Sequence, residues 1–225
     1  HRAEIKSIVI GSGITSIGEY AFAGSSALTS VQIPAGVTQI EDYAFANCSA
    51  LPAITLPVGV TEIEKGVFLN CSSLRSVTLP QGMQKVGDGA FANCTSLPSI
   101  TLPLGLREIE KGAFSGCTSL ASVSFPAAGL TDIDEGAFYG CTALKAATLP
   151  LGLREIDKNA FWGCTSLTNV SIPASVKEIK SGAFGGCTGL RSVTVAWTVP
   201  PMPRYPIFPS VPVANVQLNV PRGTE

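Results

Sequence analysis

The sequence predicts an α/β fold: a right-handed solenoid of about nine coils of 23 residues, with a parallel β-sheet on one face and short helical or 3-10 turns opposite. Three observations predict it: a phenylalanine that recurs about every 23 residues, a cysteine three residues later, and a short apolar segment closed by proline. A unit of this length is too short to bury an apolar face of its own, so successive units have to stack.

The phenylalanines set the repeat. Their steps are 23 residues, except for one of 24 where an extra residue occurs between Pro126 and Leu130. The members are Phe22, Phe45, Phe68, Phe91, Phe114, Phe138, Phe161 and Phe184. Such a set of equivalent positions is called a row below. Because stacked coils bring equivalent positions together, we expect these rings to form a continuous internal ladder.

Each unit is predicted to contain a strand and a tighter turn. In Leu74–Pro80 the apolar residues alternate inward, and Pro80 ends the strand because it cannot donate a hydrogen bond to a ladder. Glycine then turns the chain, and a second apolar pair follows, such as Leu106 and Ile109. The Gly-Ala-Phe-x-x-Cys block, as at 112–117, is too short for a full helix and predicts one helical or 3-10 turn.

The repeat extends from residue 5 to about 195 and is written L-x-x-[IV]-x-[LI]-P-x-x-[VL]-x-x-I-[EDG]-x-x-A-F-x-x-C. It resembles the BspA-like (Treponema-type) leucine-rich repeat. The resemblance implies a surface or secreted protein, because family members are bacterial, and some protist, proteins of that kind. It also implies binding, since several members are implicated in adhesion to host matrix proteins or to other cells. The family has no shared catalytic residues, and its repeat defines no ligand-binding residues to carry over.

Composition excludes several classes of function. Fifteen Lys and Arg against sixteen Asp and Glu give a formal net charge of −1, without the basic excess of a nucleic-acid-binding protein. No apolar run approaches the ~18–20 residues that a membrane span needs. The only histidine is His1, which removes His-based triads and His metal clusters. We therefore expect no enzyme, no cofactor, no metal site, no nucleic acid partner and no membrane span.

We expect two parts, a solenoid over 1–197 and a Pro-rich C-terminal cap with a closing strand over 198–225. Six prolines lie between 198 and 212, where the last coil needs a cover for its apolar end. Pro-x-x-Pro spacing is also typical of SH3-type ligands, which is the alternative. Residues 213–221 alternate like one more strand, and we expect the closing strand near 216–221. Since His1 opens the chain without a Met or a signal-peptide pattern, we expect any signal or anchor segment to lie outside this sequence.

Seven cysteines share one row. Their odd number and the lack of a C-x-x-C pair match neither a zinc site nor a complete disulfide set. The leucine-rich repeat pattern places a small buried residue at this position. We therefore expect buried, reduced, structural thiols.

The outward row of the predicted sheet is rich in hydroxyls, and the row just before the strand holds Lys6, Arg75, Lys145 and Arg191 but no acid. Small hydroxyl residues are compatible with any β-sheet, which is one interpretation. The other is a flat hydrogen-bonding face for a protein or a glycan. On that interpretation the candidate partner-binding residues are Thr55, Thr78, Thr101 and Thr148.

Most remaining charge lies in segments such as 107–111 and 154–158. A calcium site would need six to eight converging oxygens, whereas bases interleave with the acids here, so a solvated mixed-charge face is favoured. Its stacked acids are Glu62, Glu108, Asp132, Glu155 and Glu178.

Aromatic residues outside the phenylalanine row form two pairs on adjacent coils, Tyr20 with Tyr43 and Tyr139 with Trp162. Tyr139 and Trp162 stand where most other coils have Ala, Ser or Gly. They are candidate partner-binding residues because exposed aromatics are enriched at binding hot spots. Filling of a groove beside the turn is the alternative.

The function expected is a non-catalytic, extracellular or cell-surface binding scaffold, with a host matrix or cell-surface protein as its partner. A glycan-binding module is one alternative, and it would need exposed aromatics aligned for stacking on sugars. An architectural spacer that displays another domain is the other.

Overall fold

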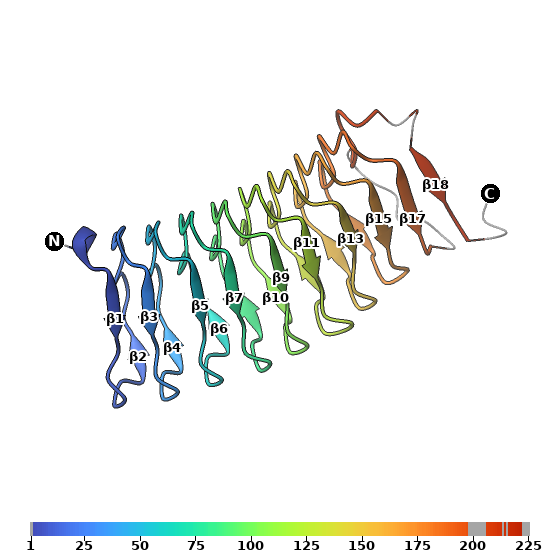
Figure 1. The fold of residues 1–225 in the computed structure, drawn as a ribbon. Helices are drawn as coiled ribbons and strands as arrows, with labels where there is room; N and C mark the ends of the chain where they lie inside the picture. Colours follow the sequence, from blue (N-terminus) through green and yellow to red (C-terminus); the bar gives the residue numbers. More distant parts are fainter. Residues whose placement is uncertain (1, 198–205, 213, 215, 222–225) are drawn as a thin grey trace.

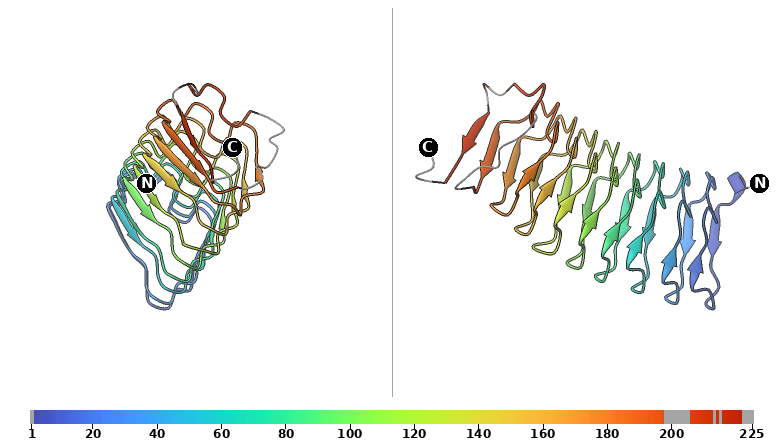
Figure 2. Two further views of the ribbon diagram at one scale, coloured as in Figure 1. Left: turned by 90° about the vertical axis from the view of Figure 1, so that its right-hand side faces the viewer. Right: turned by 180° about the vertical axis from the view of Figure 1, so that it is seen from behind.

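The computed structural model describes residues 2–197, 206–212, 214 and 216–221. It is an elongated parallel β-solenoid of about nine coils, with β1 near one end and β18 near the other (Figure 1). Two rows of strands run along the array, and a complete coil contributes one strand to each row, as the end view and the rear view in Figure 2 show.

The first row has the longer strands, and we call it the longer sheet for that reason. Its members are β1 (Ser7–Val9), β3 (Ser30–Gln32), β5 (Ala53–Thr55), β7 (Ser76–Thr78), β9 (Ser99–Thr101), β11 (Ser122–Ser124), β13 (Ala146–Thr148), β15 (Asn169–Ile172), β17 (Ser192–Val195) and β18 (Gln217–Asn219). These strands pair in four groups: β1 with β3, β5 with β7, β9 with β11, and β13 through β15 and β17 to β18. The second row has two-residue strands. They are β2 (Ser16–Ile17), β4 (Gln39–Ile40), β6 (Glu62–Ile63), β8 (Lys85–Val86), β10 (Glu108–Ile109), β12 (Asp132–Ile133), β14 (Glu155–Ile156) and β16 (Glu178–Ile179).

Every strand pair in the described residues is parallel, and its register follows the repeat. Thr55 pairs with Thr78 between β5 and β7, and Ile109 pairs with Ile133 between β10 and β12, across the extra residue. One set of equivalent residues therefore lies in line along the solenoid, as stacking of the coils predicts.

The core is a ladder of phenylalanine rings. Neighbouring rings from Phe22 to Phe184 stack with centroids 5.2 to 5.7 Å apart. All members from Phe45 to Phe184 are fully buried, and most leucine, isoleucine and valine residues of the rows on either side are buried too. This contiguous apolar interior holds the coils together, because removal of apolar surface from water is the main favourable term in folding.

All seven cysteines are buried and none forms a disulfide, so the expectation of structural thiols is confirmed. Each thiol donates to the carbonyl oxygen of a phenylalanine in the preceding coil, as Cys71 Sγ does to Phe45 O at 3.3 Å. Burial raises the pKa of Cys48 to about 11 and that of Cys117 to about 12. These side chains are therefore neutral thiols at physiological pH.

The helical or 3-10 turns expected opposite the sheet are not found there. In the described part of the chain, 3-10 structure occurs at η1 (Arg2–Glu4) and at Ala214, both outside the turn blocks, and the Gly-Ala-Phe-x-x-Cys blocks are successive turns. Ala46 N donates to Tyr43 O within a block, whereas Phe45 N donates to Val67 O of the next coil. The residues two before and two after each ladder phenylalanine have positive φ, which interrupts a right-handed helix.

The last coil is covered by residues 206–211. The Phe208 ring lies 5.6 Å from that of Phe184 and continues the ladder, and Phe184 N donates to Ile207 O at 3.0 Å. β18 pairs with β17 inside the segment predicted to close the sheet. The proposed boundary at 197/198 adjoins 198–205, which lie outside the described residues together with half of the six prolines, so this division stays a prediction.

Candidate functional site

The longer sheet presents one continuous outer surface, which we call the sheet face: the outward side chains of β1, β3, β5, β7, β9, β11, β13, β15, β17 and β18. These ten strands contain no charged residue. The four predicted threonines lie on it, and all four are exposed: Thr55, Thr78, Thr101 and Thr148. Thr55 lies in register with Thr78, Thr101 with Ser124, and Thr148 with Ser171, so the hydroxyls of paired strands lie in line.

Within the described residues, these four threonine hydroxyls have no hydrogen-bond partner in the protein. Threonines that stand one position before a strand do form hydrogen bonds within the protein. Thr29 and Thr168 donate to the carbonyl oxygens of Lys6 and Lys145, at 3.0 and 3.1 Å. A free hydroxyl has one donor and two acceptor sites, so the middle of the sheet face keeps its hydrogen-bonding capacity for a partner.

A row of basic residues borders the sheet face. Lys6, Arg75, Lys145 and Arg191 each stand one position before a strand of the longer sheet, and all four are exposed. Arg191 Nη1 donates to the carbonyl oxygen of Leu190 at 2.9 Å. Across the chain that the structure describes, none of the four has a carboxylate within ion-pair distance.

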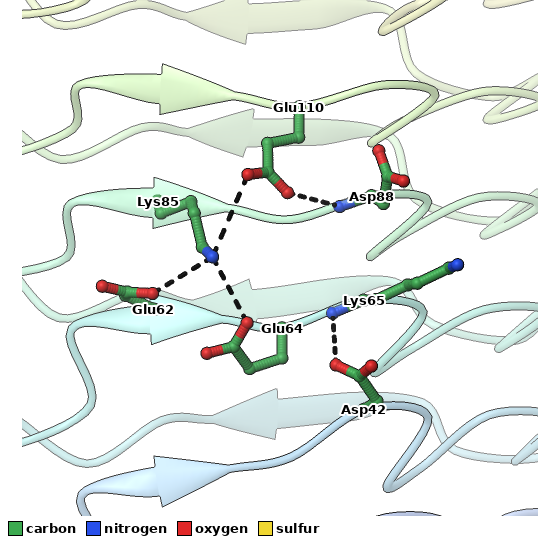
Figure 3. Close-up of polar contacts among 7 residues, drawn as sticks. All are labelled: Asp42, Glu62, Glu64, Lys65, Lys85, Asp88 and Glu110. Atoms are coloured by element: carbon green, nitrogen blue, oxygen red, sulfur yellow. Dashed lines mark hydrogen bonds and ion pairs between the residues drawn. The ribbon is translucent and has the colours of Figure 1, made fainter.

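The second row of strands carries paired charges instead. Lys85 Nζ lies 3.2 Å from Glu62, 3.3 Å from Glu64 and 3.9 Å from Glu110 (Figure 3). Glu110 also accepts a hydrogen bond from the backbone N–H of Asp88 at 3.1 Å. Part of the charge on this surface is therefore paired, as the sequence predicted for a mixed-charge face.

Acids also stand in line on this surface. Glu108, Asp132, Glu155 and Glu178 are in register on β10, β12, β14 and β16. Burial and then the nearby negative charges raise the pKa of Asp134 to about 6. Nowhere in the described residues do three or more His, Cys, Asp or Glu side chains form a group able to hold a metal ion.

The second predicted pair lies on the turn blocks, not on the sheet face. Trp162 is half-buried. Its ring leans over the next coil, so closely that a Cβ atom added to Gly185 would lie 2.1 Å from its Cε3 atom. Tyr139 is 44% exposed. The ring contacts of the described residues do not join Tyr139 to Trp162. Trp162 thus fills the groove beside the turn, while Tyr139 faces solvent.

The other tyrosine pair has an unusual backbone. The rings of Tyr20 and Tyr43 stack with centroids 5.0 Å apart, as their shared row predicts, and their φ angles are 53° and 56°. A bulky residue is rarely found in this left-handed region, and the other coils have Gly or Asn there. Tyr43 lies against Gly66, where a Cβ would be 2.3 Å from its Cε1 atom.

The sequence reasoning missed a ladder of asparagines. Asn70 Nδ2 donates to Asn47 Oδ1, and Asn93 Nδ2 donates to Asn70 Oδ1, both at 2.9 Å. The ladder ends at Gly116, where a Cβ would lie 2.2 Å from Asn93 Oδ1. An Asn-Cys dipeptide repeated in three successive coils was the available signal.

In the described part of the chain, no helix has the length and apolar character to cross a bilayer. No curated protein matches the chain. Among solved structures, a leucine-rich repeat protein from Bacteroides ovatus ATCC 8483 is similar at 27% identity with a TM-score of 0.70, covering 99% of this chain. The chain spans only 64% of the length of that protein.

A leucine-rich repeat protein of T. pallidum is similar at 28% identity with a TM-score of 0.59, covering 82% of this chain and 77% of that one. The pneumococcal vaccine antigen PcpA, at 22% identity and a TM-score of 0.52, covers 84% of this chain and 62% of that one and shares the fold alone. The family described as BspA type leucine rich repeat region matches in six copies over residues 1–103 and 86–205. The chain therefore belongs to the BspA-type leucine-rich repeat family.

Proposed function

We propose that the chain is a non-catalytic cell-surface or secreted scaffold that binds a protein of a host or of a neighbouring cell through its sheet face. The observation that carries the proposal is the row of exposed threonine hydroxyls without protein partners, held in register within the paired strands. The surface location rests on the family, whose members are surface or secreted proteins.

The distribution of side chains favours binding over catalysis. The thiols are buried and neutral, and the one histidine lies outside the described residues. Covalent catalysis needs a nucleophile beside a base that is oriented by a third group. The residues of the sheet face offer hydroxyls without such a base. They suit recognition by many weak contacts on a rigid surface, which needs little ordering on binding.

The test is a binding screen of the chain against matrix proteins, cell-surface proteins and glycans, with two variants that each remove four threonine hydroxyls from one surface. The first replaces the sheet-face hydroxyls: Thr55→Ala, Thr78→Ala, Thr101→Ala and Thr148→Ala. The matched control removes four threonine hydroxyls beside the second row of strands: Thr15→Ala, Thr38→Ala, Thr61→Ala and Thr131→Ala.

We expect the native chain and the control to bind a protein of the panel, and the sheet-face variant to bind it at least about tenfold more weakly, since each lost hydrogen bond contributes about 0.5–1.5 kcal/mol. Binding of glycans alone would favour the glycan-binding alternative. Absence of any binding, or equal weakening in both variants, would contradict the proposal.

Tyr139 and Trp162 are a second candidate contact on the turn blocks, supported by the exposure of Tyr139. The variant Tyr139→Ala tests it in the same screen, because it removes an exposed ring and leaves the packing of Trp162 on Gly185 in place. Loss of binding in this variant, with the sheet-face variant unaffected, would assign the contact to the turn blocks.

A further inference from the structure

Charge is segregated within every coil. From residue 5, where the repeat begins, the half of each coil that runs from the cysteine row through the longer sheet to the proline contains four charged residues, and all four are basic; Arg2 and Glu4 of η1 precede it. The other half, from that turn through the second row of strands and the turn block, contains fourteen acidic and eight basic residues. From residue 5 on, one side of the solenoid therefore carries only basic charges, and the other is net acidic, although the whole chain is almost neutral.

The four bases are available to a partner. They are Lys6, Arg75, Lys145 and Arg191, which border the sheet face, are exposed, and have no carboxylate within ion-pair distance among the described residues. By contrast, Lys85 and Lys180 of the acidic side each contact two or more carboxylates. Other bases of the acidic side, such as Arg107, Arg154 and Lys177, also have no ion pair among the described residues, but each directly precedes an acidic residue in the sequence. The net positive charge therefore lies beside the sheet face.

The spacing of the bases indicates the shape of the partner. Lys6, Arg75 and Lys145 are three coils apart, which is ~14 Å at the usual distance between parallel strands, and Arg191 follows two coils later at ~10 Å. An extended chain advances ~3.3 Å per residue. A segment lying along the sheet face would match this row with acidic residues about every four positions.

We propose that the partner of the sheet face is an acidic protein segment, whose carboxylates pair with this row of bases while its backbone and polar side chains meet the threonine hydroxyls. The proposal rests on the proposed function of the same face. Like charges on the far side of the solenoid repel such a segment, so the charge pattern also fixes which side it approaches. A protein carboxylate fits better than a sulfated polysaccharide, because the bases are single and dispersed, whereas heparin patches are dense basic clusters.

The experiment compares two triple charge reversals with identical net charge. The sheet-face reversal is Lys6→Glu, Arg75→Glu and Lys145→Glu. The control reversal is Arg107→Glu, Arg154→Glu and Lys177→Glu, three exposed bases beside the second row of strands. The probe is poly-L-glutamate, measured at low and at physiological ionic strength, with heparin as a parallel probe. Circular dichroism melting establishes that each variant is folded, and a neutral version with Gln at the three sheet-face positions provides a milder change.

We expect the native chain to bind poly-L-glutamate with an affinity that falls as salt rises, since exposed charges are screened. The sheet-face reversal should lose about tenfold or more of this affinity, the Gln version should lose part of it, and the control reversal should retain more than either. Absence of binding at low salt, equal losses in both reversals, or a sheet-face dependence of heparin binding alone would overturn the proposal.

The protein captured in the screen separates this proposal from the proposed function. One outcome is that this protein binds the native chain and loses affinity on removal of the threonine hydroxyls, yet is unaffected by the sheet-face reversal. In that case the proposal of an acidic segment is wrong, and the proposal that the sheet face binds a protein is supported. If neither the threonine variant nor the sheet-face reversal affects it, both are wrong.

Discussion

The indole of Trp162 lies directly over Gly185 of the next coil, at a place where a Cβ would come within 2.1 Å of the ring. Tyr43 over Gly66 and Asn93 over Gly116 repeat this relationship. These three side chains lean toward the following coil, where the glycine 23 residues later leaves room for them.

The pair Trp162 and Gly185 is therefore energetically coupled. Gly185→Ala should lower the free energy of unfolding by about 1–3 kcal/mol, because the added methyl group overlaps a ring held in a groove. In the background of Trp162→Ala the same change should cost much less, since the overlap is gone. Urea denaturation of the two single variants and the double variant measures the coupling. Additive costs would show that Trp162 does not pack on Gly185.

Phe114→Ala should be severe, with a loss of about 3–5 kcal/mol, because the ring is fully buried between Phe91 and Phe138 in the ladder. Thermal melting measures the loss, with Tyr139→Ala as the control for an exposed aromatic. A Phe114→Ala protein that melts within about two degrees of the parent would contradict the stacking of the core.

The seven thiols should be unreactive in the native state and all reactive in denaturant. Burial raises the pKa of Cys187 to about 12, as it does for Cys117, and the thiolate is the reactive form. Titration with a chromogenic disulfide reagent, with and without guanidinium chloride, counts them. Rapid labelling of the native protein, or a disulfide found by mass spectrometry, would overturn the structural role of this row.

Asp134 should make stability depend on pH. Burial and the neighbouring charges of Asp157 and Asp132 raise its pKa to about 6 in the folded state, against about 3.9 in an unfolded chain. The folded state binds the proton more tightly, so the contribution of Asp134 to the free energy of unfolding falls as pH rises from about 4 to 6 and stays low above that.

Replacement by Asn removes this penalty. Asp134→Asn should raise the free energy of unfolding at pH 7 on the order of 1 kcal/mol, after allowance for solvent screening of a partly exposed group, and should change it little at pH 4. Glu178→Gln, an exposed member of the same surface, controls for the change in net charge. An equal gain in the free energy of unfolding for Asp134→Asn at pH 4 and pH 7 would contradict the raised pKa of Asp134.

Much of the architecture could be predicted from the sequence, because a fixed period brings equivalent residues together whatever their detailed geometry. The steps between phenylalanines give the register in which Thr55 meets Thr78, and the closing strand after the last coil follows from alternation in 216–221. The turn blocks were predicted as helical because their length fits one turn. Their Gly and Asn positions, such as Gly89 and Asn93, were the neglected signal of positive φ.

The candidate site could be predicted only in part. The exposed threonines follow from period and alternation, since every second strand residue faces outward. The position of the Trp162 side chain could not be predicted in this way, because spacing along the chain does not indicate toward which neighbouring coil a side chain leans. The glycine 23 residues later was the clue, and it has meaning only once the direction of the side chain is known.

The central claim is that a protein partner covers the sheet face, and selective blocking of that face tests it most directly. Because the native thiols are buried, a single cysteine introduced as Thr101→Cys can be modified alone with a polyethylene glycol maleimide, and Thr61→Cys beside the second row of strands is the matched control. The protein captured in the screen is then measured by surface plasmon resonance against both modified chains. We expect binding to be abolished for modified Thr101→Cys and retained for modified Thr61→Cys. Full binding to modified Thr101→Cys would contradict the account.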